Sequence, residues 1–207
     1  GKYRGNMPAG LAIILDSIRK PKVPWQQLVQ AEMTDLKPDD YTDQMLDGRF
    51  FGQGISLPGI EPEEVCRVAF AVDTSGSVSD EDLRKALTEL YGITQEYNAY
   101  QIDVVSCDTT PYNHKTYTQE EGSEIIKYPF AGRGGTIFGP AFEFVDNLQE
   151  EYGEPFDAVI FFTDGYGEGW CEDYKMKFKK MIWIICDDAQ GQIKPTWGTT
   201  IHYDQYE

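Results

Sequence analysis

An aspartate and two serines follow directly after an apolar run in the first half of the chain. The run is Val68–Val72, and it is followed by Asp73, Ser75 and Ser77, with Gly76 between the serines. Consecutive apolar residues of this kind predict a strand buried on both faces, as in a parallel sheet. The polar side chains then lie at the carboxyl end of that strand, where open α/β sheets bind ligands. A carboxylate and hydroxyls are hard oxygen ligands, so they indicate a site for Mg²⁺, Mn²⁺ or Ca²⁺.

Two later stretches are predicted to bring further oxygen ligands to the same edge of the sheet. Gly132–Thr136 reads G-R-G-G-T, a glycine-rich turn that delivers a threonine just before a helix. Phe156–Thr163 has the character of another buried strand, and Asp164 follows it in a T-D-G sequence. Because the carboxyl ends of parallel strands meet at one edge, Thr136 and Asp164 are expected close to Asp73.

Taken in chain order, D-x-S-x-S, G-G-T and T-D-G resemble the metal-ion-dependent adhesion site of von Willebrand factor A (VWA) domains. The resemblance covers roughly residues 64–204, and the wider wording is most like the VWA-like domain at the C-terminal end of metallopeptidase-like proteins. It implies that a divalent cation is held by Asp73, Ser75, Ser77, Thr136 and Asp164, and that an acidic side chain of a partner protein completes the coordination shell.

Each of these residues also has an ordinary structural explanation. Ser75 and Ser77 are of a type that satisfies backbone groups in turns, and Asp164 begins a common turn dipeptide. Asp108 ends another predicted strand and is a candidate supporting residue, although a strand-end turn explains it better. The two histidines, His114 and His202, are far apart in sequence, and surface or packing roles suit them best. The case for the site therefore rests on all three loops together.

The remaining pattern predicts strands that alternate with helices. Further strands are expected over Gln101–Cys107, Ile182–Cys186 and Thr199–Tyr203, and a short antiparallel edge hairpin over 109–130. Helices are expected after Ser79, which opens a capping-box pattern, and after Gly139. A third helix is expected where aromatic residues share helical spacing, namely Trp170, Tyr174 and Phe178. The predicted fold is α/β, a doubly wound, mostly parallel, Rossmann-like VWA sheet with an N-terminal helical extension.

Residues 1–63 are expected to form that helical extension and an irregular linker, and residues 64–207 the VWA-like domain. Two apolar stripes predict two short helices within residues 1–34: Leu11, Ile14, Leu15 and Ile18, then Trp25, Leu28, Val29 and Met33. Such stripes need cover, so this segment is expected to pack on the VWA domain or on a domain upstream of it. Residues 1–34 carry a net charge of +3, although the whole chain carries −17.

Composition and missing motifs exclude several function classes. The net charge of −17 argues against nucleic acid or an anionic membrane as the main partner. The chain has no apolar run of the roughly 18 residues that a membrane helix needs. Its four cysteines form no C-x-x-C pair and favour a reducing cytoplasm. A haloacid-dehalogenase-type phosphatase would need an aspartate where Ser75 stands, and neither G-K-[ST] nor H-E-x-x-H occurs. We therefore expect no enzyme activity and no catalytic residues.

The sequence thus predicts a cytoplasmic module that binds a divalent cation and uses it to capture a partner protein. The family resemblance implies a MoxR-type AAA+ ATPase as that partner. One alternative is a structural or assembly subunit, for example of a phage complex, whose metal only braces the loops. Another is the non-catalytic part of a larger metallopeptidase-like protein.

Overall fold

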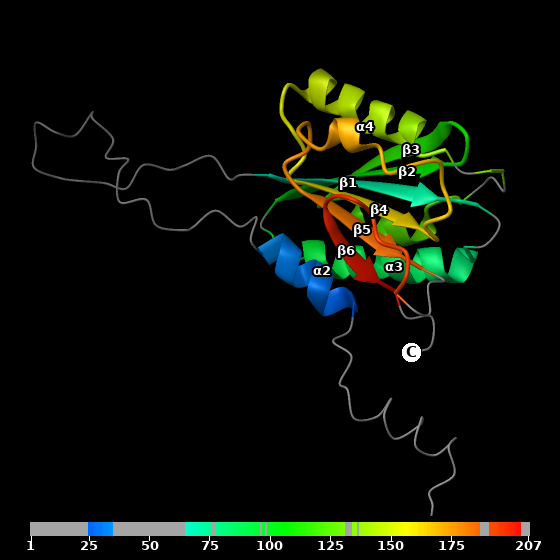
Figure 1. Cartoon of the computed structure of the whole chain (residues 1–207). Helices are drawn as coiled ribbons and strands as arrows, with labels where there is room; N and C mark the ends of the chain where they lie inside the picture. The colour runs from blue at the N-terminus through cyan, green and yellow to red at the C-terminus, as the bar shows by residue number, and fades with distance from the viewer. Residues whose placement is uncertain are drawn as a thin grey trace, which may run out of the picture.

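The computed structural model describes residues 25–34, 65–75, 78–95, 97, 99–130, 134–135, 137–186 and 191–203. Within them, a six-stranded sheet has the order β3-β2-β1-β4-β5-β6, and helices cover both of its faces (Figure 1). The strands are β1 (Cys66–Asp73), β2 (Tyr100–Cys107), β3 (Pro111–Thr118), β4 (Ala158–Thr163), β5 (Met181–Ile185) and β6 (Thr199–His202). Only β3 runs antiparallel to its neighbour. The predicted doubly wound, mostly parallel fold is confirmed.

Strand β1 lies at the centre of the sheet, between β2 and β4. Its side chains alternate between two cores, because successive residues of a strand point to opposite faces. Val68, Phe70 and Val72 belong to one apolar cluster, whereas Ala69 and Ala71 belong to the other. All five are at most 1% exposed, so β1 is buried on both faces as its continuous apolar run predicts.

Helix α3 (Asp80–Thr94) follows β1 and covers the face of the sheet on which Val68 and Phe70 lie (Figure 1). The side chain of Ser79 caps its first turn: the Asp82 N–H donates to Ser79 Oγ at 3.1 Å, and Ser79 Oγ donates to Asp82 Oδ2 at 2.5 Å. The predicted capping pattern is therefore confirmed. This cap fixes where α3 begins, and so where the loop that carries Ser75 ends.

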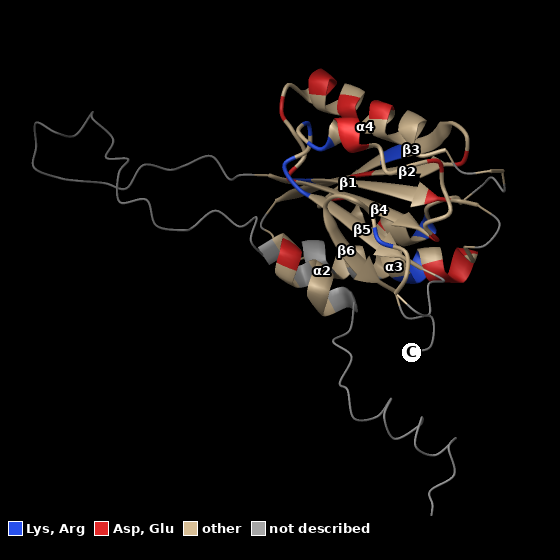
Figure 2. Cartoon of the chain, viewed as in Figure 1, with Lys and Arg blue, Asp and Glu red and all other residues tan. Residues whose placement is uncertain are grey.

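Helix α4 (Gly139–Tyr152) covers the opposite face (Figure 1). Pro140 lies in its first turn, and Gly153 ends it with a φ of 72°, a conformation that favours glycine. The core beneath α4 is rich in aromatic rings, and Phe142 stacks on Phe161 with ring centroids 5.4 Å apart. Figure 2 shows acidic residues along α4 and at the amino end of α3, outside these cores.

Helix α2 (Trp25–Thr34) lies on the same face as α3, beside β6 (Figure 1). Val29 and Met33 are 1% and 0% exposed and join the apolar cluster that α3 also covers. Lys180 Nζ donates to the Glu32 carbonyl oxygen at 2.6 Å, and its ammonium lies 3.2 Å from the Glu32 carboxylate. Of the two covers expected for this segment, the structure places Val29 and Met33 of the second stripe on the α/β domain, whereas Leu28 is 41% exposed. The first stripe lies outside the described residues, and the boundary at residue 63 stays a prediction.

Two local predictions were wrong. No helix forms over residues 170–180, where only the short 3₁₀ helix η3 (Glu172–Tyr174) is present. Backbone φ angles of 77° at Gly169 and 51° at Cys171 are left-handed and prevent a regular helix from starting there. The helical spacing of the aromatic residues arises because this irregular segment turns them toward one core, where Tyr174 stacks on Phe178 at 5.9 Å.

The second error concerns the edge hairpin. Strand β3 supplies the antiparallel edge strand, but the residues after it form the 3₁₀ helix η2 (Gly122–Lys127) instead of another strand. Ile125 is fully buried in the core beside α3, which requires the chain to turn inward there.

The four cysteines are free thiols. Among the described residues, no helix is long and apolar enough to cross a membrane.

Candidate metal centre

The candidate site lies at the carboxyl ends of three neighbouring parallel strands. Asp73 is the last residue of β1, Asp108 follows β2, and Asp164 follows β4. The chain leaves β1 through α3 on one face and enters β4 from α4 on the other (Figure 1). The sheet order therefore reverses at β1, and such a switch point leaves a crevice outside the strand ends where ligands bind.

The Asp73 carboxylate is buried and held on both oxygens. Its Oδ1 accepts a hydrogen bond from the Ser75 N–H at 2.9 Å. Its Oδ2 accepts one from the Thr163 hydroxyl at 2.7 Å, and the same hydroxyl oxygen accepts the Gly165 N–H at 3.0 Å. Asp73 is 0% exposed, as is Thr163. These bonds tie the loop after β1 to the loop after β4.

Asp164 provides a second buried carboxylate at the same edge. It is 3% exposed, and its Oδ1 accepts the Tyr166 N–H at 2.9 Å. Burial raises the pKa of Asp73, the bonds from Ser75 and Thr163 oppose that rise, and the negative charge of Asp164 adds to it. Two nearby carboxylates that burial and mutual repulsion disfavour are stabilised by a cation between them. With the hydroxyl of Ser75, these carboxylates form a set of oxygen donors that suits a hard divalent cation.

Asp108 accepts hydrogen bonds that shape the loop after β2. Its Oδ1 accepts the backbone N–H of Thr109 and, at 3.2 Å, that of Thr110, which is the strand-end turn considered from the sequence. Its backbone carbonyl accepts the Ile137 N–H at 2.9 Å. A Cβ on Gly134 would lie 3.0 Å from Asp108 Oδ2, so the glycine-rich loop passes close against this carboxylate. Asp108 therefore positions the loop that carries Thr136.

The structure brings together three of the predicted ligands and the supporting residue. Asp73, Ser75, Asp164 and Asp108 all lie at this edge, and Ser75 is half-buried. Ser77 and Thr136 lie outside the described residues, so their roles stay predictions. Among the described residues, no group of three or more histidine, cysteine, aspartate or glutamate side chains is arranged to hold a metal. A metal at this edge therefore depends on hydroxyl ligands as well as carboxylates.

Sequence reasoning missed three residues that shape the site. The sequence marks Thr163 only as the end of a strand, although its place before Asp164 in T-D-G is a usable signal. Thr74 is buried, and its hydroxyl donates to the Cys107 carbonyl oxygen at 3.1 Å. It also shares a short hydrogen bond with the Tyr112 hydroxyl, which comes from β3. No local pattern could have identified Tyr112, because strand pairing alone brings it to β1.

His114 lies beside an acidic partner and has a packing role away from the site. His114 Nε2 lies 2.8 Å from Asp103 Oδ1, and the ring packs edge-on against Phe144 with centroids 5.2 Å apart. Asp103 is 1% exposed and also accepts hydrogen bonds from Gln101, Thr116 and Tyr152 at 2.8, 2.6 and 2.9 Å. This agrees with the packing role expected for His114.

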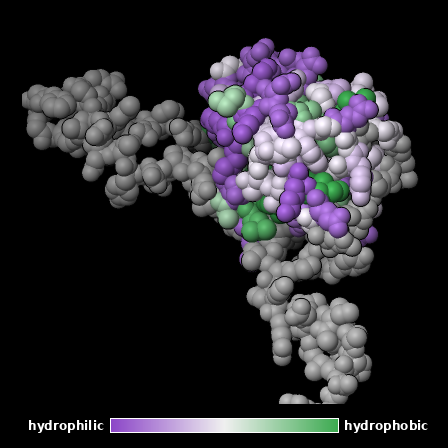
Figure 3. All heavy atoms as spheres, in the orientation of Figure 1, coloured by the Kyte–Doolittle hydropathy of each residue, from purple (hydrophilic) through white to green (hydrophobic). Residues whose placement is uncertain are grey.

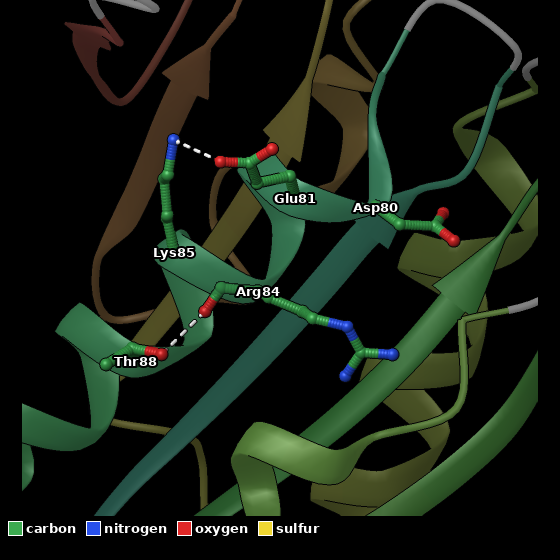
Figure 4. Close-up of a pocket in the computed structure, with 5 residues that line it drawn as sticks. All are labelled: Asp80, Glu81, Arg84, Lys85 and Thr88. Atoms are coloured by element: carbon green, nitrogen blue, oxygen red, sulfur yellow. Dashed lines mark hydrogen bonds and ion pairs between the residues drawn. The ribbon is translucent and has the colours of Figure 1, made fainter. Parts of the chain in front are cut away.

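A hollow of about 410 Å³ on the outer face of α3 does not form a second site (Figure 4). Its lining side chains serve the helix and its neighbour. Lys85 pairs with Glu81 at 3.0 Å, and Thr88 Oγ1 donates to the Arg84 carbonyl oxygen at 2.8 Å. Arg84 points away from that pair (Figure 4), and its Nη1 donates to the Ile126 carbonyl oxygen at 2.9 Å. The hollow therefore adds nothing to the candidate site.

Comparison with known proteins identifies similar sequences and folds. A family model described as VWA-like domain (DUF2201) matches residues 68–204. A Thermotoga maritima protein, described as an uncharacterized protein, is 25% identical over 166 residues, which are 79% of this chain and 39% of that protein. The chain thus spans well under half the length of that relative.

Among solved structures, BatB from Bacteroides thetaiotaomicron is 18% identical, with a TM-score of 0.48 over 59% of this chain and 67% of that one. The SpRpn10 VWA domain is 9% identical, with a TM-score of 0.49 over 69% of this chain and 90% of that one.

Proposed function

Since this chain belongs to the VWA-like domain family, we propose that it is a protein-binding module that depends on a divalent cation. The observation that carries the proposal is the pair of buried carboxylates, Asp73 and Asp164, at the switch point of the sheet. Thr163 and the Ser75 backbone hold Asp73 in one orientation. Both oxygens of Asp73 already accept hydrogen bonds, so its carboxylate is fixed in the orientation that a bound cation needs.

The residues proposed to hold the cation are those of the family motif: Asp73, Ser75, Ser77, Thr136 and Asp164. Mg²⁺ is the cation we favour, with Mn²⁺ and Ca²⁺ as alternatives, because all the donors are hard oxygens. A bound cation would supply an open coordination position for a carboxylate of the partner. Thr163 holds the Asp73 carboxylate on one side of the site, and Asp108 lies against Gly134 of the glycine-rich loop on the other.

We propose binding and not catalysis as the role of this edge. The descriptions of the matching family and of the Thermotoga maritima relative name no catalytic activity. A catalytic metal works with a nearby group that accepts a proton. His114 is committed to Asp103 in the packing beneath α4, so it does not serve as that group. Hydrolysis of phosphoesters and peptides with Mg²⁺ or Mn²⁺ present is therefore expected to be undetectable.

The proposed partner is a protein that presents an acidic side chain, and family resemblance favours an AAA+ ATPase of the MoxR type. The chain spans only 39% of its Thermotoga maritima relative, so the activity of a longer protein would include parts outside this sequence. The proposed cytoplasmic location rests on the free cysteines. A gene for such an ATPase beside this one in the genome would support the partnership.

The proposal is tested by capture of the purified ATPase on the immobilised chain. Retention is expected in Mg²⁺, lost in EDTA and restored when Mg²⁺ is added back. The double variant Asp73→Ala with Ser75→Ala is expected to retain no ATPase, whereas the matched control Glu150→Ala with Ser123→Ala retains it, because both control positions are exposed. Circular dichroism checks that each variant folds, and Asp73→Asn replaces the double variant if that one does not. Equal retention in Mg²⁺ and EDTA contradicts the metal dependence.

A further inference from the structure

Two exposed apolar side chains lie on the loops of the candidate metal centre. Tyr166 is 71% exposed and follows Asp164 by two residues, and Ile137 is 36% exposed and follows the glycine-rich loop. Four other large apolar side chains are exposed in the described residues: Leu28 in α2, Val65 just before β1, Ile126 in η2 and Met176 just after η3. Hydrophobic residues form only small separate patches on the face shown in Figure 3. We call Ile137 and Tyr166 the apolar rim. Exposed apolar residues beside a candidate site mark a contact surface.

The backbone of each rim residue is attached to a residue of the site. The Ile137 N–H donates to the Asp108 carbonyl oxygen at 2.9 Å. The Tyr166 N–H donates to the Asp164 carboxylate at 2.9 Å. Both side chains are therefore exposed from backbone that is already held in place. A contact made by such residues loses little conformational freedom on binding, which favours affinity.

The two loops that carry the rim also pack against each other. Phe138, the neighbour of Ile137, is fully buried, with its ring centroid 5.0 Å from that of Phe161. A Cβ on Gly167, the neighbour of Tyr166, would lie only 2.3 Å from the Phe138 ring. The loops therefore meet through Phe138 and Gly167. Each rim residue is therefore the chain neighbour of one of these two contacting residues, and the rim lies on abutting loops.

Electrostatics indicates why an apolar contact is needed. The chain carries −17, so a partner surface with many acidic groups is repelled as a whole. One carboxylate alone gives the site no means of telling one acidic protein from another. Apolar contact beside that carboxylate adds affinity without adding charge, and it restricts the choice of partner.

We propose that the apolar rim binds an aliphatic or aromatic side chain next to the acidic residue of the protein partner. The recognised segment is then a single Asp or Glu flanked by apolar residues, and not a polyacidic stretch. This inference rests on the proposed function, because it places the acidic residue at the metal centre. It assigns Ile137 and Tyr166 as the residues that determine specificity.

The test uses three fluorescent pentapeptides with blocked ends and the full 207-residue chain in Mg²⁺. The first peptide has one glutamate flanked by leucine and phenylalanine, the second has one glutamate flanked by serines, and the third has three consecutive glutamates. Fluorescence anisotropy is expected to show that the first peptide binds at least about tenfold more tightly than the other two. A tenfold change in affinity is typical when an anchor residue of an interface is removed.

Substitutions then locate the preference. Tyr166→Ser and Ile137→Ser are each expected to weaken binding of the first peptide about tenfold or more and to leave the second unchanged. Met176→Ser is the matched control, because Met176 is 92% exposed and lies outside the rim. EDTA is expected to abolish binding of all three peptides.

The outcomes separate this inference from the proposed function. Metal-dependent binding with equal affinity for the first two peptides overturns the rim and leaves the proposed function standing. The rim is likewise overturned, and the proposed function still stands, if Met176→Ser weakens binding of the first peptide as much as Tyr166→Ser does. Binding of no peptide at millimolar concentration, or binding that EDTA does not affect, overturns the proposed function and the inference with it.

Discussion

Replacing Thr163 by valine tests how the candidate site is held together. Valine keeps the shape of threonine but removes the hydroxyl, which bonds both Asp73 Oδ2 at 2.7 Å and the Gly165 N–H at 3.0 Å. Losing the bond to the carboxylate costs about 2 kcal/mol and losing the neutral bond about 1 kcal/mol, since all these groups are buried or half-buried. The free energy of unfolding should fall by about 3 kcal/mol, or about 9 °C in Tm for a chain of this size.

The assay is urea denaturation at pH 7 without metal, followed by far-UV circular dichroism. Thr163→Ser is the control, because it keeps the hydroxyl, and it should lose clearly less stability than the valine variant. Loss of the same bond should also raise the pKa of Asp73 further, since that bond opposes the effect of burial. If the valine and serine variants unfold at the same urea concentration as the wild type, the Thr163 hydroxyl does not link the two loops.

Three further predictions concern parts of the fold around the site. Burial by itself would raise the pKa of Asp103, but the hydrogen bonds from His114, Thr116, Gln101 and Tyr152 outweigh burial and lower that pKa. The free energy of unfolding should therefore fall as the pH drops below about 4, where the unfolded chain takes up this proton more readily than the folded one. Thermal unfolding measured against pH should show a smaller fall in Asp103→Asn. Met33→Ala should cost about 3 kcal/mol in urea unfolding, because Met33 is 0% exposed, and an unchanged midpoint would mean that α2 does not pack on the domain. Gly167→Ala should lower Tm through contact with Phe138, whereas Gly135→Ala, whose Cβ would meet no atom within 4 Å, should not; equal Tm values would contradict the close approach of the two loops.

The sheet and the central loops could be predicted because their signals are local. The apolar run that ends at Asp73 is long enough to specify a strand buried on both faces, and Ser79 marks the start of the following helix. Parallel strands place their carboxyl ends together, so the sequence alone predicts that Asp73 and Asp164 meet at one edge. Both carboxylates lie there, and both are buried.

The errors arise where tertiary packing decides the conformation. Trp170 and Tyr174 show helical spacing, but left-handed backbone at Gly169 and Cys171 gives a loop whose aromatic side chains fill the core beneath α4. Tyr112 reaches the site only through the pairing of β3 with β2, which the sequence around it does not reveal. Regular spacing of apolar residues indicates that their side chains face one core. It does not by itself show whether the backbone between them is a helix or a loop.

The apolar rim illustrates a related limit. Tyr166 and Ile137 carry no sequence signal of their own, because the sequence does not show whether an apolar residue in a loop is buried or exposed. The neighbouring residues are packed closely instead: the Phe138 ring is fully buried and lies where a side chain on Gly167 would be. Residues of this kind can be recognised only when the packing around them is known.

We propose that the edge formed by Asp73, Ser75 and Asp164 binds a divalent cation. Isothermal titration calorimetry of the full chain with Mg²⁺, and then with Mn²⁺, measures this most directly. One site per chain is expected, with modest affinity because few carboxylates contact the ion. The double variant Asp73→Ala with Ser75→Ala should give only the heat of dilution while its circular dichroism spectrum stays native. Identical titration curves for the wild type and this variant would show that the cation, if bound, is bound elsewhere.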